Sequence, residues 1–474
     1  MTLDHIALMV GAGVLYALIV PARWRGWVLL VASIGAVYWL QPALNVRWMD
    51  YALPTLTLVI ALVGWAATRP RQVAITGEDR LVVLLVVAVA LLIAATRTVN
   101  VPFALTSRPP PFDVVLVGAV IAGALVLAVA RLPQSRASAG LLTALIGLFI
   151  VIKTDPFITA VSAFIRERVG QAPELASPLD LGWLGFSYVA FRLIHTIRDR
   201  QSGKLPALSL RQYLTFIIFF PALTAGPIDR AERHLRDDEA LADMRRYDAD
   251  RFAEAGGRIA SGLFKKFIIA DSLAAFSLSA VTVEQATTTG GMWLLLYAYT
   301  LRLFFDFSGY TDIAIGIGLL FGFKLPENFN RPYLKPNLTA FWQSWHITLS
   351  NWVRFYVFMP LTRALLRRRW PNQAVILCGT LATMLIIGLW HGVTWPFFIW
   401  GLWHGVGLFA HKVWTDRTRG WYRDLRGRPR LAQLWHGVGV AITFHFVALG
   451  WVWFALPRTD QAIGAFALLF GIAS

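Results

Sequence analysis

Long apolar runs without a charged side chain most limit what this chain can fold into. A transmembrane helix needs about 20 mostly apolar residues, and roughly 17 suffice. Runs of this kind occupy Ile6–Ala22, Gly26–Val46, Tyr51–Thr68, Val114–Ala130 and Trp370–Trp390. Because the core of a bilayer holds no water, backbone groups there must be hydrogen-bonded within the segment itself, as in a helix. The sequence therefore predicts an all-α, polytopic integral membrane protein.

The composition leads to the same class of protein. The 474 residues are 57% hydrophobic and 15% charged, whereas soluble domains carry about 25% charged residues. Further apolar segments, several of them short, raise the expected number of membrane-embedded helices to about eleven to thirteen. We assign residues 1–140 to N-terminal transmembrane helices and residues 141–474 to a core that carries the motifs described below, within one continuous membrane domain.

The net charge of +17 comes from 44 Lys and Arg residues against 27 Asp and Glu residues. In a soluble chain this excess would indicate a nucleic-acid partner, but here the cations stand in short loops between apolar segments. Such loops face the cytoplasm in membrane proteins. We therefore expect a lipid bilayer and no nucleic acid as a partner. The basic loop Lys412–Arg430 is interpreted as a cytoplasmic anchor, with a dock for a carrier protein as the alternative.

Two histidines lie in apolar surroundings, where polar groups are costly and often functional. His391 belongs to the motif GLWHG at 388–392, after a long uncharged run. An imidazole titrates near neutrality and can act as a general base, although an interfacial histidine can also simply bond a backbone carbonyl. His346 closes the motif FWQSWH at 341–346 and follows the proline-containing segment Asn330–Pro336. The prolines of that segment predict irregular backbone. Such backbone either lines a cavity or forms a connection at the surface.

Two carboxylates, Asp306 and Asp312, stand six residues apart on either side of Tyr310 in the motif FDFSGYTD. Six residues correspond to about 600° of helical rotation, so the two side chains lean to opposite faces. They are therefore not expected to form a paired acid and base. We expect each to cap a helix or to pair with a buried arginine.

The sequence gives little support for bound metals or nucleotides. The single cysteine, Cys378, excludes an intramolecular disulfide and any multi-cysteine metal site. His404 and His411 are seven residues apart, a spacing that does not match the three or four residues of a compact chelate. Neither a Walker A motif nor a GxGxxG motif occurs. We predict no metal and no bound cofactor.

Six motifs follow one another in the C-terminal half: FFPALTAGPIDR (219–230), GLFKKFIIAD (262–271), FFDFSGYTDIAIG (304–316), PENFNRPY (326–333), FWQSWHITLS (341–350) and GLWHGVTWPFFIWGLWHG (388–405). In this combination and order they resemble the membrane-bound O-acyltransferase family. Within the family, some elements are similar to the alginate O-acetyltransferase branch and others to the teichoic-acid D-alanyltransferase branch. Gln343 and Ser344 stand where the family commonly has basic residues, and Phe355 stands where an aspartate is common.

The resemblance implies a many-helix membrane fold around a tunnel in which an activated acyl group meets an acceptor hydroxyl. By motif match His391 is the essential histidine, which takes the hydroxyl proton, and His346 is the second, which orients the acceptor or stabilises charge on the tetrahedral intermediate. The remaining candidates, for substrate binding or the tunnel lining, are Trp342, Trp345, Trp390, Ser350, Asp306, Asp312, Tyr310 and His404. The implied donor is a thioester of coenzyme A or of a carrier protein.

The function expected from the sequence is O-acylation, with acetyl as the preferred group, of a cell-envelope or exported polysaccharide at the bacterial cytoplasmic membrane. The donor or an acyl-carrier protein would come from the cytoplasmic side, and the polysaccharide or a partner transferase from the other side. Alternatives are D-alanyl transfer to teichoic acid, a non-catalytic subunit that passes the acyl group across the bilayer, and a transporter. A transporter would be expected to show duplicated halves, and the sequence shows no internal repeat.

Overall fold

The computed structural model describes residues 2–98, 105–106, 109–425 and 427–472. Every regular element in these ranges is a helix, which confirms the predicted all-α class. The chain divides into two compact units: unit 1 consists of Met1–Ile259 and Ala314–Leu325, and unit 2 of Ala260–Ile313 and Pro326–Ser474. The division expected at residue 140 separates N-terminal helices without a recognised motif from the rest of the chain, and it stays a prediction.

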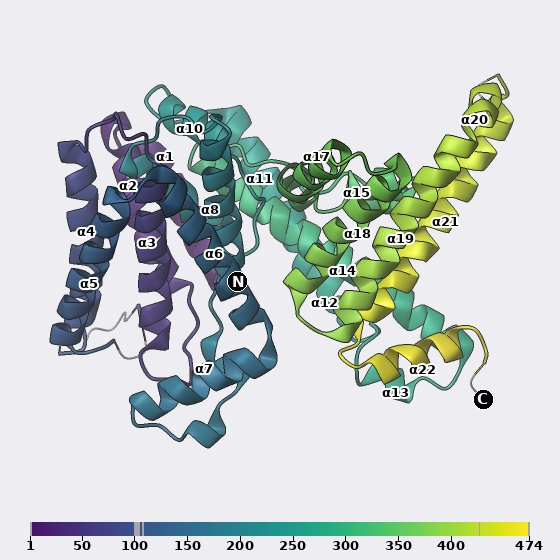
Figure 1. The fold of residues 1–474 in the computed structure, drawn as a ribbon, viewed down its shortest axis with the longest axis horizontal. Coiled ribbons are helices and arrows are strands. Elements are labelled where there is room, and N and C mark those ends of the chain that lie inside the picture. Colours follow the sequence, from purple (N-terminus) through teal and green to yellow (C-terminus); the bar gives the residue numbers. More distant parts are fainter. Residues whose placement is uncertain (1, 99–104, 107–108, 426, 473–474) are drawn as a thin grey trace. The chain divides into compact units, whose positions relative to one another are not determined.

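Unit 1 contains most of the N-terminal helices (Figure 1). They are α1 (Leu3–Ile19), α2 (Ala22–Trp39), α3 (Met49–Thr68), α4 (Gly77–Ala95), α5 (Phe112–Arg131), α6 (Gln134–Lys153), α7 (Asp155–Arg168), α8 (Phe186–Gln201), α9 (Leu210–Ile217), α10 (Ala231–Ala240) and most of α11 (Ala249–Leu263), with the 3-10 turns η1 (Pro173–Leu175), η2 (Pro178–Leu181) and η3 (Phe220–Ala222). Helix α3 is largely buried and packs against α2, α5, α6, α8 and α9.

Small residues let the helices around α3 approach closely. A Cβ atom added at Gly64 would lie 2.6 Å from Leu193 of α8 and 2.7 Å from the Tyr213 hydroxyl of α9. Close approach through small side chains is the usual way in which membrane helices pack, because lipid provides no hydrophobic drive for their association. Gly64 therefore sets the spacing at the centre of unit 1.

A buried arginine caps the break in the helix that proline and glycine cause near residue 220. Arg192 of α8 donates from its two terminal nitrogens to the carbonyl oxygens of Ile217 and Ala222, each at 2.8 Å. These carbonyls lie where α9 ends and η3 follows, so they lack helical partners of their own. Arg192 thus stabilises the turn that the Pro and Gly residues predicted.

Unit 2 contains the rest of the helices. They are the π-helical segment η4 (Phe264–Ala270), α12 (Asp271–Ala274), α13 (Thr282–Gln285), α14 (Thr289–Leu320, whose last residues belong to unit 1), η5 (Pro332–Leu334), α15 (Leu338–Trp342), α16 (Ile347–Val353), the π-helical segment η6 (Arg354–Phe358), α17 (Met359–Arg367), α18 (Asn372–His391), α19 (Trp395–Arg417), α20 (Arg419–Leu425), α21 (Pro429–Ala455) and α22 (Thr459–Leu469). Helix α19 packs against both α18 and α21.

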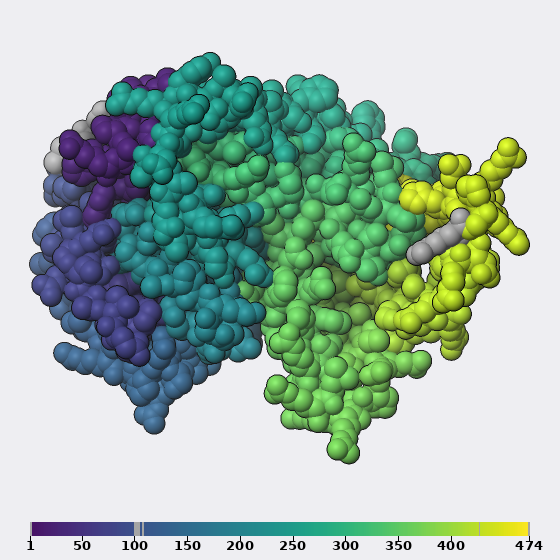
Figure 2. Space-filling view, turned by 90° about the horizontal axis from the view of Figure 1, so that it is seen from above, coloured from purple at the N-terminus to yellow at the C-terminus, as the bar shows by residue number. Residues whose placement is uncertain are grey.

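The basic loop Lys412–Arg430 is the tip of a helical hairpin. Helices α19 and α21 form the hairpin and α20 lies at its tip, where the space-filling view shows exposed surface (Figures 1 and 2). Asp416 pairs there with Lys412 and Arg419, each at 2.6 Å. Arg426 lies outside the described residues. The two interpretations of this loop, anchor or dock, both stay predictions.

Six described helices are long and apolar enough to cross a membrane: α3, α5, α6, α14, α18 and α21. Helix α1 is apolar but shorter. This confirms a polytopic membrane protein. The expected number of eleven to thirteen embedded helices stays a prediction, because it includes short and more polar segments that length and composition alone do not select.

Outside these six helices, a buried ion pair ties α7 to the turn η2. Arg166 donates to both carboxylate oxygens of Asp180, at 2.7 and 3.0 Å, and the Ser162 hydroxyl donates at 2.7 Å. Asp180 is fully buried. The hydrogen bonds from Arg166, which outweigh the effect of burial, lower the pKa of Asp180 to about 2.

This pair predicts a loss of stability in acid. The carboxyl pKa is about 2 when folded and about 3.9 when unfolded. The unfolded state therefore binds more protons, and the contribution of the pair is complete above the unfolded pKa and is lost as the pH falls toward 2. We expect Asp180→Asn to lower the thermal unfolding temperature in detergent at pH 7, and the difference to shrink between pH 5 and pH 3. Asn at the exposed Asp424 is the control. A difference for Asp180→Asn that is constant with pH would contradict the assignment.

Candidate functional site

His391 is the last residue of α18, where close packing against α19 places it. A Cβ atom added at Gly401 of α19 would lie 2.7 Å from the carbonyl oxygen of Met384 in α18, so only glycine fits at this crossing. The half-buried imidazole of His391 lies against two rings of α19, with ring centroids 5.7 Å from Phe397 and 5.9 Å from Trp400. The imidazole also contacts Phe454 of α21, with ring centroids 4.6 Å apart.

His346 lies between α15 and α16 and is buried. Its backbone is in the left-handed region, with φ of 43° and ψ of 54°, a conformation that is uncommon for residues other than glycine. Its imidazole contacts Phe307 of α14 edge to face at 4.7 Å, and its centroid lies 6.4 Å from that of Trp390. Trp390 in turn contacts His391 at 4.5 Å. The structure therefore brings the two predicted histidines to the same indole.

An aromatic cluster extends from this point through unit 2. We define it by five buried residues: Trp342, Trp345, Trp400, His404 and Trp451. Ring centroids in it are 4.9 Å apart for Trp400 and His404, 5.2 Å for Trp342 and His404, and 5.2 Å for Trp345 and Trp451. Because Trp400 also contacts His391, His404 is connected to the predicted essential histidine through one ring.

Several polar atoms of this region have no hydrogen-bond partner among the described residues. They are both ring nitrogens of His404, Nε2 of His346, and the indole nitrogens of Trp342 and Trp400. Buried polar atoms are nearly always hydrogen-bonded, and exceptions often mark catalytic positions or bound groups. These atoms are therefore candidates for contact with polar groups of a substrate.

Tyr333 of the proline-containing segment before His346 packs inward. The hydroxyl of Tyr333 donates to the carbonyl oxygen of Thr300 at 2.9 Å, and its ring contacts Trp345 at 5.6 Å. Asn330, Arg331 and Leu334 of the same segment are exposed, so whether the segment lines a cavity or connects along the surface stays a prediction. Ser350 is less available for chemistry, because its hydroxyl donates to the carbonyl oxygen of Trp345 at 3.1 Å.

The two carboxylates of α14 pair with adjacent lysines of the π-helical segment η4. Lys265 contacts Asp312 at 2.5 Å, and Lys266 contacts Asp306. Lysines of η4 are thus partners that the sequence did not predict. Tyr310 lies between Asp306 and Asp312 in the sequence of α14, and its side chain is buried. Whether these three residues bind substrate or line a tunnel stays a prediction.

Two features of the structure were not found from the sequence. Asn328 is fully buried and contacts His346; its motif PENFNRPY was recognised, but no role was assigned to this position. In unit 1, His195, Asp199 and Glu232 bring potential metal-binding atoms within 4.8 Å of one another. The Nε2 atom of His195 already accepts the backbone N–H of Ala231, at 3.1 Å. The absence of a metal stays a prediction.

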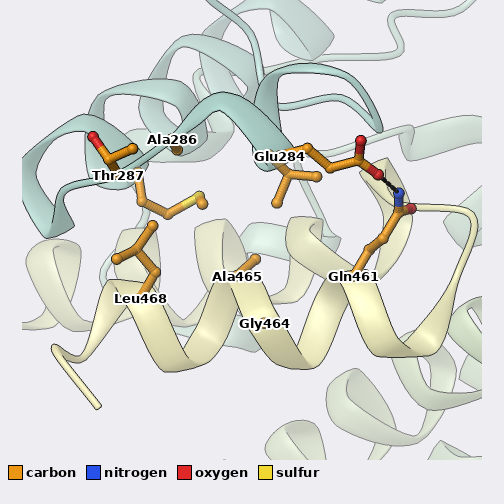
Figure 3. A pocket seen from close by; sticks show the side chains of 9 residues that line it. Glu284, Ala286, Thr287, Gln461, Gly464, Ala465 and Leu468 are labelled. Carbon is orange, nitrogen blue, oxygen red and sulfur yellow. Dashed lines mark hydrogen bonds between the residues drawn. The ribbon is translucent and has the colours of Figure 1, made fainter. Parts of the chain in front are cut away.

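A cavity of about 440 Å³ lies between the α13 region and α22 (Figure 3). Gln461 of α22 donates across its rim to Glu284 of α13 at 3.0 Å, and the lining otherwise includes the apolar side chains of Val283, Ala465 and Leu468. None of the site residues predicted from the sequence lines this cavity. The predicted tunnel beside His391 stays a prediction.

The fold and site together define a class of protein: a many-helix membrane protein with two histidines and unpartnered polar atoms in an aromatic interior. Residues 177–449, more than half of the chain, match the sequence profile of the membrane-bound O-acyltransferase family. The chain belongs to this family. The match includes every motif from 219 to 405 on which the resemblance was based.

Curated relatives are similar over a comparable stretch. A probable alginate O-acetylase of Azotobacter vinelandii is 38% identical over 60% of this chain and 53% of its own length. The teichoic acid D-alanyltransferase of Bacillus subtilis is 33% identical over 58% of this chain and 69% of its own length. A peptidoglycan O-acetyltransferase of Helicobacter pylori is 35% identical over 55% and 46% of the two chains. The chain thus spans about half the length of the alginate and peptidoglycan relatives.

The glycine at the crossing of α18 and α19 provides a test of how His391 is positioned. In Gly401→Ala the new methyl group would meet the α18 backbone, so we expect the unfolding free energy to fall by about 1–3 kcal/mol, as in other overpacked interiors. Gly437→Ala in α21 is the matched control, since nothing lies within 4 Å of its added Cβ and alanine favours a helix. Thermal unfolding in detergent measures both. Equal effects of the two substitutions would contradict the close crossing.

Proposed function

We propose that this chain transfers an acyl group, acetyl in the first place, from a thioester donor to a hydroxyl of a cell-envelope or exported polysaccharide. The donor is coenzyme A or a carrier protein on the cytoplasmic side, and the chain lies in a bacterial cytoplasmic membrane. The observation that supports this most strongly is the placement of His346 and His391 against the same indole, that of Trp390, inside an aromatic interior.

The chemistry of the step suits this site. The acceptor oxygen attacks the thioester carbonyl carbon while His391 takes the hydroxyl proton. The carbon–sulfur bond of the tetrahedral intermediate then breaks and the new acyl–oxygen bond remains. The leaving sulfur takes the proton from the His391 imidazolium, so the products are the ester and a thiol, and neutral His391 is restored. His346 orients the acceptor or stabilises the charged intermediate. Aromatic neighbours such as Phe397 and Phe454 limit access of water, which would otherwise hydrolyse the thioester.

D-alanyl transfer to teichoic acid is a second candidate. It is favoured by the Bacillus subtilis relative, of whose length this chain covers 69%, against 53% for the Azotobacter vinelandii relative. Both reactions transfer an acyl group to a hydroxyl and would use the same two histidines. Supplying purified protein with acetyl and D-alanyl thioesters in parallel distinguishes them by the group transferred.

Removal of the proposed base tests the function directly. We expect His391→Ala in purified protein to reduce transfer of a radiolabelled acyl group by about 10²–10⁴-fold, the usual contribution of general acid–base catalysis. His436→Ala is the matched control, because His436 is an exposed histidine of α21. Transfer by His391→Ala at the rate of the native chain would disprove the assignment. Equal losses in the two variants would attribute the effect to folding.

A further inference from the structure

Asn328 is held in one orientation by the start of α16. Its backbone carbonyl accepts the N–H of Ile347 at 2.9 Å. Its side-chain Oδ1 accepts the N–H of Thr348 at 3.1 Å and the Thr348 hydroxyl at 2.8 Å. A backbone N–H only donates, so the side-chain atom that faces it must be the amide oxygen and not the amide nitrogen. The chain itself therefore fixes which way this amide points.

The same oxygen fixes the hydrogen position on His346. Nδ1 of His346 lies 3.2 Å from Oδ1 of Asn328. An amide oxygen only accepts, so Nδ1 must carry the hydrogen. A neutral imidazole has one N–H, and Nε2 is then left with a free lone pair. This Nε2 is buried and has no hydrogen-bond partner among the described residues.

The backbone at His346 is built around this contact. The left-handed conformation, with φ of 43°, is uncommon for a residue with a side chain, and such residues gather at functional sites. Here it turns the chain so that the N–H groups of Ile347 and Thr348 and the ring of His346 all reach Asn328. Asn328 accepts from all three, and this offsets the cost of the turn.

We infer that Asn328 is a positioning residue that holds His346 in the Nδ1–H tautomer, so that Nε2 accepts a hydrogen bond from a hydroxyl of the acceptor. The inference rests on the proposed acyl transfer and deepens it. Two roles for His346 were open, orientation of the acceptor and stabilisation of the charged intermediate. A free lone pair cannot donate a hydrogen bond to a negatively charged oxygen. Neutral His346 therefore serves the hydroxyl-bearing acceptor.

The tautomer can be measured without any substrate. In full-length protein labelled with ¹⁵N-histidine and held in lipid, we expect His346 to show a protonated Nδ1 and an unprotonated Nε2, with its signals assigned by their loss in His346→Gln. Asn328→Ala should abolish the preference for this tautomer, and Asn328→Asp, which keeps an acceptor oxygen, should retain a protonated Nδ1. A protonated Nε2 with an unprotonated Nδ1 in the native chain, or an unchanged spectrum in Asn328→Ala, would overturn the inference.

Kinetics test the effect of the tautomer on transfer. We expect Asn328→Ala to lower kcat for acyl transfer by about 10–100-fold, by analogy with the loss seen when the hydrogen-bond partner of a metal-binding histidine is removed. Asn330→Ala is the matched control in the same motif, because Asn330 is exposed, and it should retain the native kcat. Native kcat in Asn328→Ala would overturn the positioning role. A native chain with the expected spectrum but no acyl transfer would disprove the proposed function and the acceptor contact, and would leave the tautomer assignment standing.

Discussion

The cost of burying polar groups in an apolar interior is the constraint on which this structure depends. An unpaired buried amide, hydroxyl or imidazole costs about 1–3 kcal/mol, and lipid offers no water to replace a missing partner. The described residues meet part of this cost by pairing buried polar groups within the protein. Arg192 binds the free carbonyls of a broken helix, and Arg166 binds both oxygens of Asp180. Other buried polar atoms of the described residues lack a partner, and among them Nε2 of His346 and both ring nitrogens of His404 lie in the aromatic interior of the candidate site.

Close helix crossings position the residues of the candidate site. Because Gly401 lets α19 reach the backbone of α18, the end of α18 is held against the aromatic rings of α19 and α21, and His391 has a defined environment. His346 reaches the same indole from a short irregular segment that is stabilised by Asn328. One histidine is thus positioned by helix packing and the other by hydrogen bonds.

The sequence predicted the class of fold because that class follows from local properties. Uncharged apolar runs such as Trp370–Trp390 form helices wherever they fall in the structure, here α18. The motifs likewise singled out His391 and His346, and the structure places both against the indole of Trp390. The partners of Asp306 and Asp312 could not be predicted, since the lysines of η4 are 40 and 47 residues away and π-helical turns alter which side chains share a face. The role of Asn328 could not be predicted for a similar reason. Its contact with His346 depends on the left-handed backbone at His346, which no periodic pattern in the sequence indicates.

In acyl transfer across a membrane, the donor and the acceptor are on opposite sides. This distinguishes it from transfer on a single side. The most direct test uses purified protein in sealed vesicles, with a radiolabelled acetyl thioester on the side of the basic α20 tip and a polysaccharide acceptor on the other side. The account predicts labelled polysaccharide with no other protein present, and none when both substrates are on the side away from that tip. Label that reaches the polysaccharide only after a second protein is added would contradict it, because the chain would then carry the acyl group without completing the transfer.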